Sequence, residues 1–190
     1  MIEGDIIVVF DTEYTAWKGS RERNWSYPGQ YREIVQIGAV KLDVRRGLEE
    51  IDSFERIVRP RFNPALSEYF IKLTGITQER VDREGTDFTE ALRDFVEFAG
   101  PGTILYSNGG DEKYLYENCG YYGVICPLGI DRFRNLSAFL SREACTTDHV
   151  ETGQLDTVFG IPSDLPAHDG LADARKLAST IRHFRQSGRI

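Results

Sequence analysis

A continuous apolar run near the start of the chain, Ile6 to Phe10, ends in the acidic tripeptide Asp11-Thr12-Glu13. A short run this apolar and rich in β-branched residues is typical of a buried strand. A buried strand requires other layers of secondary structure against the sheet that contains it. This first element therefore favours a layered fold built around a central sheet.

The remaining elements are predicted from apolar periodicity and from glycine and proline stops. Strands are predicted at 34–42, 51–58 and 103–107, with a further short strand near Ile130. Helices are predicted from about residue 64 to Gly75, and at 88–99, 111–120, 136–140, 153–159 and 169–186. Three strands followed by alternating helices and strands predict an α/β fold with a central mixed sheet flanked by helices. No repeat or linker interrupts the sequence, and we expect one domain over residues 1–190.

Composition and charge limit the classes of function. A net charge of −7 and a pI near 5.1 argue against a protein that holds long duplexes by counterion release. They do not exclude an enzyme that takes one strand end into a pocket. No apolar stretch approaches the ~20 residues that a membrane helix needs, and the first ten residues do not resemble a secretory signal. The cysteines, Cys119, Cys126 and Cys145, form no Cys-x-x-Cys pair, so we expect reduced thiols in a cytoplasmic protein.

The two acids that end the first strand are candidates for metal ligands. Side chains two residues apart on a strand point to the same face, so Asp11 and Glu13 project together. Two carboxylates at the end of an apolar run repel each other and resist burial. A divalent cation between them would resolve that conflict, although the pair alone also fits a polar strand end that faces solvent.

Two further segments carry groups of the same chemistry. Asp111 opens a predicted helix after a glycine pair, and His168 lies five residues before Asp173, in the first turns of the last predicted helix. Taken singly, Asp111 fits a helix N-cap and Asp173 fits a favourable place near the helix dipole. Taken with Asp11 and Glu13, these residues form a set of four acids and one histidine.

Oxygen-rich ligands of this kind suit Mg²⁺ or Mn²⁺ better than zinc. Two such ions activate a water and stabilise the leaving oxygen of a phosphodiester, and a histidine near neutrality can take the proton from that water. The set therefore contains the groups that phosphodiester hydrolysis requires, without a nucleophilic serine or cysteine.

In these residues the chain resembles the histidine-containing (DEDDh) branch of the DEDD exonuclease superfamily. The ordered signature is Asp-x-Glu, then Asp, then His with Asp five residues later, and here it falls on Asp11 and Glu13, Asp111, and His168 and Asp173. The resemblance implies a ribonuclease-H-like three-layer fold. It also implies two divalent ions held by the four acids, with His168 as the general base.

Intermediate segments carry the resemblance further. EIVQIGAVKLD (33–43) looks like the family's second strand, and LSEYFIKLTGITQERVD (66–82) looks like the stretch that contributes to the nucleotide pocket. The second stretch is more similar to the histone-mRNA 3′-end exonucleases than to proofreading subunits. By this resemblance the substrate-binding residues are Thr12, Tyr14, Leu73, Thr74 and Gly75, and Asn108, in the turn before Asp111, is placed with them.

Two features depart from the usual pattern of this family, and two histidines lie outside its motifs. Family members often carry an aromatic residue where this chain has Gly110, before the second-motif aspartate. The segment from Ala16 to Arg32 is long and rich in aromatic residues and arginines; it could grip single-stranded substrate by stacking and phosphate contacts, or be a disordered surface loop. The other two histidines, His149 and His183, have no acid or cysteine at ligand spacing and are predicted to face solvent.

The sequence thus predicts a metal-dependent 3′–5′ exonuclease that releases nucleoside 5′-monophosphates from the 3′ ends of single-stranded RNA or short oligonucleotides. A DNA-trimming or proofreading enzyme, a phosphoesterase of small nucleotides and a catalytically dormant binding module remain alternatives. Because the chain is acidic and lacks a basic domain, either a protein partner that supplies specificity or a short substrate is also expected.

Overall fold

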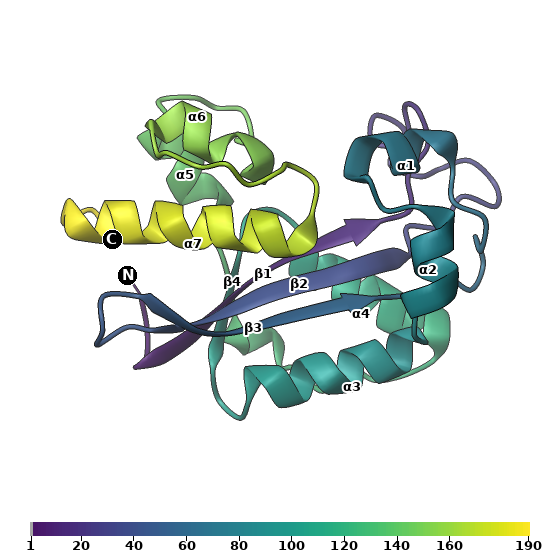
Figure 1. Cartoon of the computed structure of the whole chain (residues 1–190), viewed down its shortest axis with the longest axis horizontal. Coiled ribbons are helices and arrows are strands. Elements are labelled where there is room, and N and C mark those ends of the chain that lie inside the picture. Colours follow the sequence, from purple (N-terminus) through teal and green to yellow (C-terminus); the bar gives the residue numbers. More distant parts are fainter. Residues whose placement is uncertain (1) are drawn as a thin grey trace.

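The computed structural model describes residues 2–190, and at its centre lies a mixed sheet of five strands (Figure 1). The strands are β1 (Ile6–Tyr14), β2 (Ile34–Asp43), β3 (Glu49–Ile57), β4 (Ile104–Ser107) and β5 (Phe133–Asn135). Their order across the sheet is β3-β2-β1-β4-β5. The pairs β1–β2 and β2–β3 are antiparallel, whereas β1–β4 and β4–β5 are parallel. The predicted mixed sheet is therefore confirmed.

Helices cover both faces of this sheet. The helices are α1 (Glu68–Thr74), α2 (Gln78–Glu84), α3 (Phe88–Ala99), α4 (Asp111–Tyr122), α5 (Ser137–Glu143), α6 (Leu155–Phe159) and α7 (Gly170–Gln186), with the short 3₁₀ helices η1 (Ile130–Arg132) and η2 (Thr152–Gln154). α7 lies on one face, α3 and α4 lie on the other, and α1 and α2 lie beyond the end of the sheet at which β1 finishes (Figure 1). The predicted three layers are thus present. Among the helices of residues 2–190, none combines the length and the apolar character needed to cross a membrane.

Some boundaries differ from the predicted ones. α2 was not predicted, because Val81 is its one buried side chain and no apolar period marks it. α1 starts at Glu68 rather than near residue 64. The Ser67 side chain accepts a hydrogen bond from the Phe70 N–H at 3.0 Å and so caps the helix at this point. The short strand predicted near Ile130 lies three residues later, after η1. The three cysteines are free thiols, as predicted.

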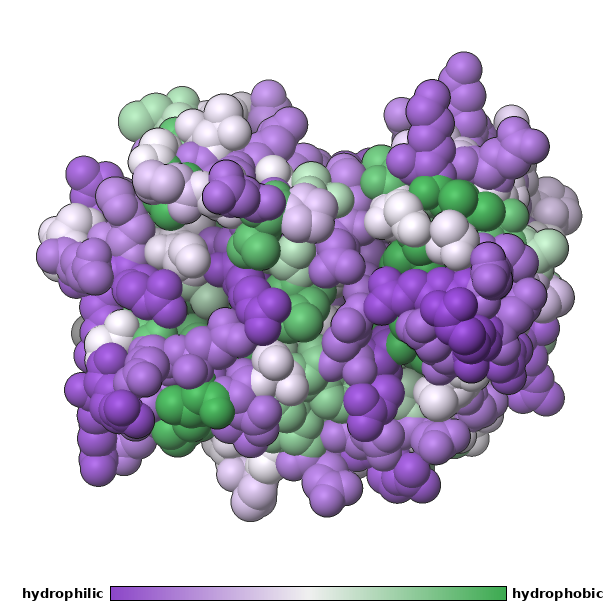
Figure 2. Space-filling view, viewed as in Figure 1, coloured by the Kyte–Doolittle hydropathy of each residue, from purple (hydrophilic) through white to green (hydrophobic). Residues whose placement is uncertain are grey.

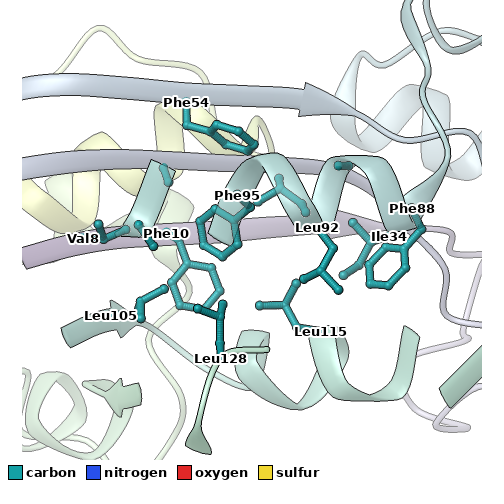
Figure 3. Close-up of a cluster of buried hydrophobic side chains, with 14 of the residues drawn as sticks. Val8, Phe10, Ile34, Phe54, Phe88, Leu92, Phe95, Leu105, Leu115 and Leu128 are labelled. Atoms are coloured by element: carbon teal, nitrogen blue, oxygen red, sulfur yellow. The ribbon is translucent and has the colours of Figure 1, made fainter. Parts of the chain in front are cut away.

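Alternation along β1 divides its side chains between two cores. Val8 and Phe10 belong to the cluster under α3 and α4, whereas Ile7 and Val9 belong to the cluster under α7. In the first cluster the Phe10 ring lies 5.5 Å from the ring of Phe95 on α3 (Figure 3). Because the alternation continues beyond the apolar run, the odd-numbered residues that follow face α7.

Two glycines determine how closely α7 approaches the sheet. A Cβ atom on Gly38 of β2 would lie 2.1 Å from the carbonyl carbon of Gly170, the first residue of α7. The Gly170 N–H donates to the Gln36 side-chain oxygen at 2.7 Å, and the Gln36 amide donates to Asp169, the N-cap of α7, at 3.3 Å. The first turn of α7 is thereby held directly against β2, beside the end of β1.

We predict that Gly38→Ala lowers the free energy of unfolding by about 1–3 kcal/mol or more, because the added methyl group collides with backbone that cannot move aside cheaply. Thermal or denaturant unfolding measures the change. Gly120→Ala is the matched control, since Gly120 lies within α4 with no atom within 4 Å of an added Cβ. The control is expected to raise stability by about 0.5–1 kcal/mol, and equal stabilities for the two variants would contradict the prediction.

Candidate active site

Five ionisable side chains meet at the end of the sheet where β1 finishes. Asp11 and Glu13 come from β1, Asp111 from the first turn of α4, and Asp173 from the first turn of α7, with His168 just before that helix. All four carboxylates are buried, each with at most 9% of its surface exposed. The structure therefore brings together every predicted catalytic residue, although the acids are separated by up to 162 positions in the chain.

The two acids of β1 project toward α7, as the period of the strand predicts. Asp11 is paired in the sheet with Gly38, and Glu13 with Gln36. These partners are the residues that hold the start of α7 against the sheet. Consequently the same local contact positions the β1 acids and the acid of α7 beside each other.

Asp111 is fixed from the opposite face of the sheet. The backbone N–H and the hydroxyl group of Thr12 both donate to Asp111 Oδ1, at 3.0 and 2.7 Å. Thr12 stands between the two β1 acids and faces α4, so its side chain links that helix to the strand. A Cβ atom on Gly110 would lie 3.2 Å from the Tyr114 ring. In this chain an aromatic ring therefore packs beside the second-motif aspartate, although it comes from the following turn.

His168 and Asp173 are held by the turn that enters α7. His168 has a left-handed backbone, with φ of 60°, and its N–H donates to Asp173 Oδ2 at 3.0 Å. The other oxygen, Oδ1, is buried and has no hydrogen-bond partner among residues 2–190. A ring nitrogen of His168, a carboxylate oxygen of Glu13 and one of Asp173 all lie within 4.8 Å of one another. The imidazole therefore reaches into the acid cluster.

The four carboxyl groups strongly disfavour their ionised forms. Burial raises the pKa of Asp11 and of Glu13 well above the usual range, and the neighbouring carboxylates raise both further. Burial raises the pKa of Asp111 to about 7 against the lowering effect of its hydrogen bonds from Thr12. Burial likewise raises the pKa of Asp173 to about 6, against the His168 N–H and a nearby lysine. The cluster is therefore a concentration of negative charge that the protein alone stabilises poorly.

That lysine, Lys176, was not identified from the sequence. Its side chain is buried, and its ammonium group lies 3.2 Å from the Gly153 carbonyl oxygen, 3.8 Å from Asp156 Oδ2 and 3.9 Å from Asp173 Oδ1. The helical spacing between Lys176 and Asp173 was visible, but the depth of α7 in the fold was not. Lys176 offsets part of the negative charge on the α7 side of the cluster.

The residues of this cluster fit divalent cations. The donors are mainly carboxylate oxygens, which Mg²⁺ and Mn²⁺ prefer. Asp173 Oδ1 is a buried acceptor that receives no hydrogen bond from residues 2–190, and a cation would satisfy it. Burial and, after it, the neighbouring carboxylates raise the pKa of Asp11 and of Glu13, and a bound cation would offset both effects.

The acid cluster lines a pocket of about 790 Å³. Its walls are the segment 16–25 after β1, the side chains of Tyr69 and Leu73 on α1, and the segment 149–154. In Figure 2 the outline of the molecule is notched between the α5–α6 region and α1, and hydrophobic surface lies on the α1 side. The pocket thus joins an acidic floor to a partly apolar wall, a combination suited to a phosphate-bearing ligand with an aromatic base.

The long segment from Ala16 to Arg32 is folded against the body. The Trp25 indole N–H donates to the Thr15 carbonyl oxygen at 2.8 Å, and its ring lies 5.4 Å from the ring of Tyr14. Arg21 forms an ion pair of 2.6 Å with Glu151, which joins this segment to the opposite wall of the pocket. Of the two interpretations left open by the sequence, the disordered surface loop is wrong.

The residues predicted to bind substrate fall into two groups. Thr12, Tyr14, Leu73 and Asn108 line the pocket. The Asn108 amide donates to the Val150 carbonyl and the Thr152 hydroxyl, and its buried side-chain oxygen has no hydrogen-bond partner among residues 2–190. Thr74 and Gly75 are not among the lining residues; the Thr74 hydroxyl donates to the Phe70 carbonyl, and Gly75 ends α1 with a left-handed backbone.

His149 is exposed, as predicted, but its place beside the candidate active site was not predicted. His149 lines the pocket, where its Nδ1 lies 2.9 Å from the Ser137 hydroxyl and its Nε2 lies 3.8 Å from Glu151. The position of Glu151 two residues later was the available signal, but only the fold shows that this segment closes over the pocket. His183 is exposed, as predicted.

Comparison with known proteins places this geometry in context. A family model described as Exonuclease, RNase_T, matches residues 8–180. The mouse 3′-5′ exoribonuclease 1 is 37% identical over 195 aligned positions, covering 97% of this chain and 54% of the mouse protein. The human 3′-5′ exoribonuclease 1 is 36% identical over 138 residues, covering 73% of this chain and 34% of the human protein. The chain therefore spans only about a third to a half of these relatives.

Solved structures show the same fold. The nuclease domain of 3′hExo, a DEDDh family member bound to rAMP, superposes with a TM-score of 0.80 at 26% identity, over 97% of this chain and 93% of that domain. A 3′-exonuclease described in the 3′-end specific recognition of the histone mRNA stem-loop gives a TM-score of 0.82 at 26% identity, over 97% of this chain and 64% of that one. The predicted ribonuclease-H-like fold is confirmed.

We predict that Asp111→Asn stabilises the metal-free protein, and that the gain depends on pH. The folded-state pKa of Asp111, about 7, lies above the usual value of 3.8, so wild-type stability is lost as pH rises from about 4 through 7. The amide oxygen can still accept both hydrogen bonds from Thr12. Denaturant unfolding in EDTA should show that the variant's free energy of unfolding, relative to that of wild type, rises between pH 4 and pH 7. Above pH 7 this difference should stay constant, at no more than about 4 kcal/mol.

The exposed Asp164, changed to Asn, is the matched control and should show no such trend. A difference between Asp111→Asn and wild type that is independent of pH would contradict the predicted electrostatic cost.

Proposed function

Since this chain belongs to the exonuclease family that the RNase_T model describes, we propose that it is a metal-dependent 3′–5′ exonuclease of single-stranded RNA ends. The observation that carries the proposal is the gathering of four buried carboxylates and His168 in one pocket. This arrangement argues against a dormant binding module, because the buried acids lower the stability of the fold unless a cation neutralises them.

Membership of the DEDDh family implies dependence on divalent metal ions. We propose that the ions are two Mg²⁺ or Mn²⁺, held by Asp11, Glu13, Asp111 and Asp173, since carboxylate oxygens are the ligands that these ions prefer. When bound, such ions polarise the phosphodiester and stabilise the charge on the leaving oxygen.

The residues around the acids position the reacting groups. Burial lowers the pKa of His168, so its imidazole is neutral at physiological pH and can accept a proton from water. The oxygen of that water attacks the last phosphorus atom, and the bond to the 3′ oxygen of the preceding nucleotide breaks. That oxygen leaves with a proton from solvent, and a nucleoside 5′-monophosphate is released. The hydrogen bond from the His168 N–H to Asp173 keeps the base beside the acids.

The names of the relatives support RNA, rather than DNA, as the proposed substrate. The curated relatives are named exoribonucleases, and the related nuclease domain of 3′hExo is described as bound to rAMP. The partly apolar wall formed by Leu73 and Tyr69 is suited to the face of a terminal base. Because the chain is acidic, we propose that a protein partner supplies specificity for a particular RNA.

The reaction is tested by a gel time course on 5′-labelled single-stranded RNA and DNA of equal sequence. Mg²⁺ and Mn²⁺ are compared with EDTA, and Asp11→Asn is run beside wild type. We expect a metal-dependent ladder that shortens from the 3′ end, faster on RNA and absent with the variant. Equal rates on both sugars would remove the RNA preference, and turnover of dinucleotides alone would assign a small-nucleotide phosphoesterase.

We predict that His168→Asn lowers kcat by about 10²–10⁴-fold, the usual contribution of a general base. Asparagine tolerates the left-handed backbone at this position but cannot take the proton. In wild type at saturating metal, the acidic fall of kcat/KM should have its midpoint below pH ~6.5, because the pKa of His168 is lowered. This midpoint should be lost in the variant.

The exposed histidine of α7, His183, provides the control, since His183→Asn removes the same group far from the pocket. If both variants kept wild-type kcat and the same pH profile, His168 would not be the base.

A further inference from the structure

A second depression adjoins the active-site pocket and is not used by the proposed reaction. It has a volume of about 750 Å³, and its lining includes Arg32, Lys113, Tyr116 and Ile130. Tyr114 lines both this depression and the active-site pocket. The two hollows are therefore neighbours, separated by one aromatic side chain on the first turns of α4.

The wall between the two hollows is built around a fixed cation. The Arg32 guanidinium lies 4.5 Å from the centre of the Tyr114 ring and 4.6 Å from that of Trp25, and its Nε lies 3.0 Å from a carboxylate oxygen of Glu117. Only 14% of the Arg32 side chain is exposed. Because its charge is paired and its position is fixed, this arginine acts by holding aromatic rings in place rather than by capturing a free anion.

Exposed aromatic rings continue the surface along α4. Glu117 also accepts a hydrogen bond from the Tyr121 hydroxyl at 2.8 Å, and the Tyr121 ring lies 5.5 Å from that of Tyr31. The rings of Tyr31 and Phe62 are stacked at 4.8 Å and are 40% and 43% exposed. Since Tyr121 lies ten residues after Asp111, the stack stands about 15 Å along the helix from the acids.

A free cation stands between the acids and this stack. Lys113 is exposed on α4, lines the second depression and forms no ion pair within the described part of the chain. In a protein of net charge −7, an unpaired lysine beside aromatic rings is a local departure from the acidic surface. It is placed to contact a phosphate group that lies between two stacked bases.

We propose that this α4 surface, formed by Lys113, Tyr114, Tyr31 and Phe62, binds the nucleotides that precede the 3′-terminal one in single-stranded RNA. The inference rests on the proposed function and names the site that receives the rest of the strand. Exposed rings suit bases, because every base has a π face that can stack without sequence readout. The shared Tyr114 wall makes the surface continuous with the active-site pocket, so one strand can occupy both.

The test compares a substrate long enough to span the whole α4 surface with one too short to reach the stack of Tyr31 and Phe62. A 5′-labelled decamer and a dinucleotide are hydrolysed by wild type, by the double variant Tyr31→Ser with Phe62→Ser, and by Lys113→Gln. Matched controls are Ile51→Ser, an exposed apolar residue of β3, and Arg185→Gln, an exposed cation near the end of α7. Thermal unfolding verifies that all proteins are folded.

We expect the ratio of kcat/KM for the decamer to kcat/KM for the dinucleotide to fall about tenfold in the double variant, the size of one lost stack. The ratio should also fall in Lys113→Gln and stay at the wild-type value in both controls. An unchanged ratio in the double variant and in Lys113→Gln would overturn the proposal and leave the α4 surface for a protein partner.

Fluorescence anisotropy of the decamer in EDTA separates this proposal from the proposed function. If wild type degraded neither substrate but its decamer binding still depended on the α4 surface, the exonuclease assignment would fail and the binding surface would stand. If wild type degraded the decamer while all variants bound it equally, the reverse would hold.

Discussion

The backbone contact between Gly38 and Gly170 is the constraint on which the rest of the site depends. It brings the first turn of α7 against β2 at the level where β1 carries its acids. Any side chain at Gly38 would push the helix away, and Asp173 and His168 would move with it. The Gln36 side chain reinforces the contact by accepting from the Gly170 N–H. A polar site is thus positioned by close packing, which tolerates far less displacement than a network of exposed hydrogen bonds.

The acid cluster shows how the fold sustains a group of charges that destabilises it. Burial and repulsion from neighbouring carboxylates raise the pKa of each carboxyl group. The large hydrophobic cores on both faces of the sheet offset the resulting loss of stability. Two devices limit the cost within the protein. The Thr12 N–H and hydroxyl support Asp111, and the buried Lys176 stands beside Asp173. The residual repulsion is what gives the site its affinity for divalent cations, because a cation relieves it directly.

An acidic protein that acts on nucleic acid cannot rely on a general attraction for phosphate groups. In the binding mode that we propose, this chain concentrates its contacts on a few side chains instead. Arg32 is fixed among aromatic rings and Arg21 bridges the pocket walls, while Lys113 is exposed on α4 and forms no ion pair with residues 2–190. Stacking depends little on net charge, so a strand end can be held by rings while the acids remain available to cations. A small number of stacking and charged contacts is suited to a protein that binds one end of a strand rather than a long duplex.

Features that follow from local geometry were determined by the sequence alone. The shared face of Asp11 and Glu13 follows from the strand period, and α3 follows from the helical period of its apolar residues and the Asp87 cap. The order of the acidic motifs, matched to a known family, was enough to predict the fold and the catalytic set. The tertiary structure decided which distant groups share one buried volume. The Thr12–Asp111 bond, the burial of Lys176 and the approach of His149 to the pocket have no local signature, because they depend on how closely separate elements pack.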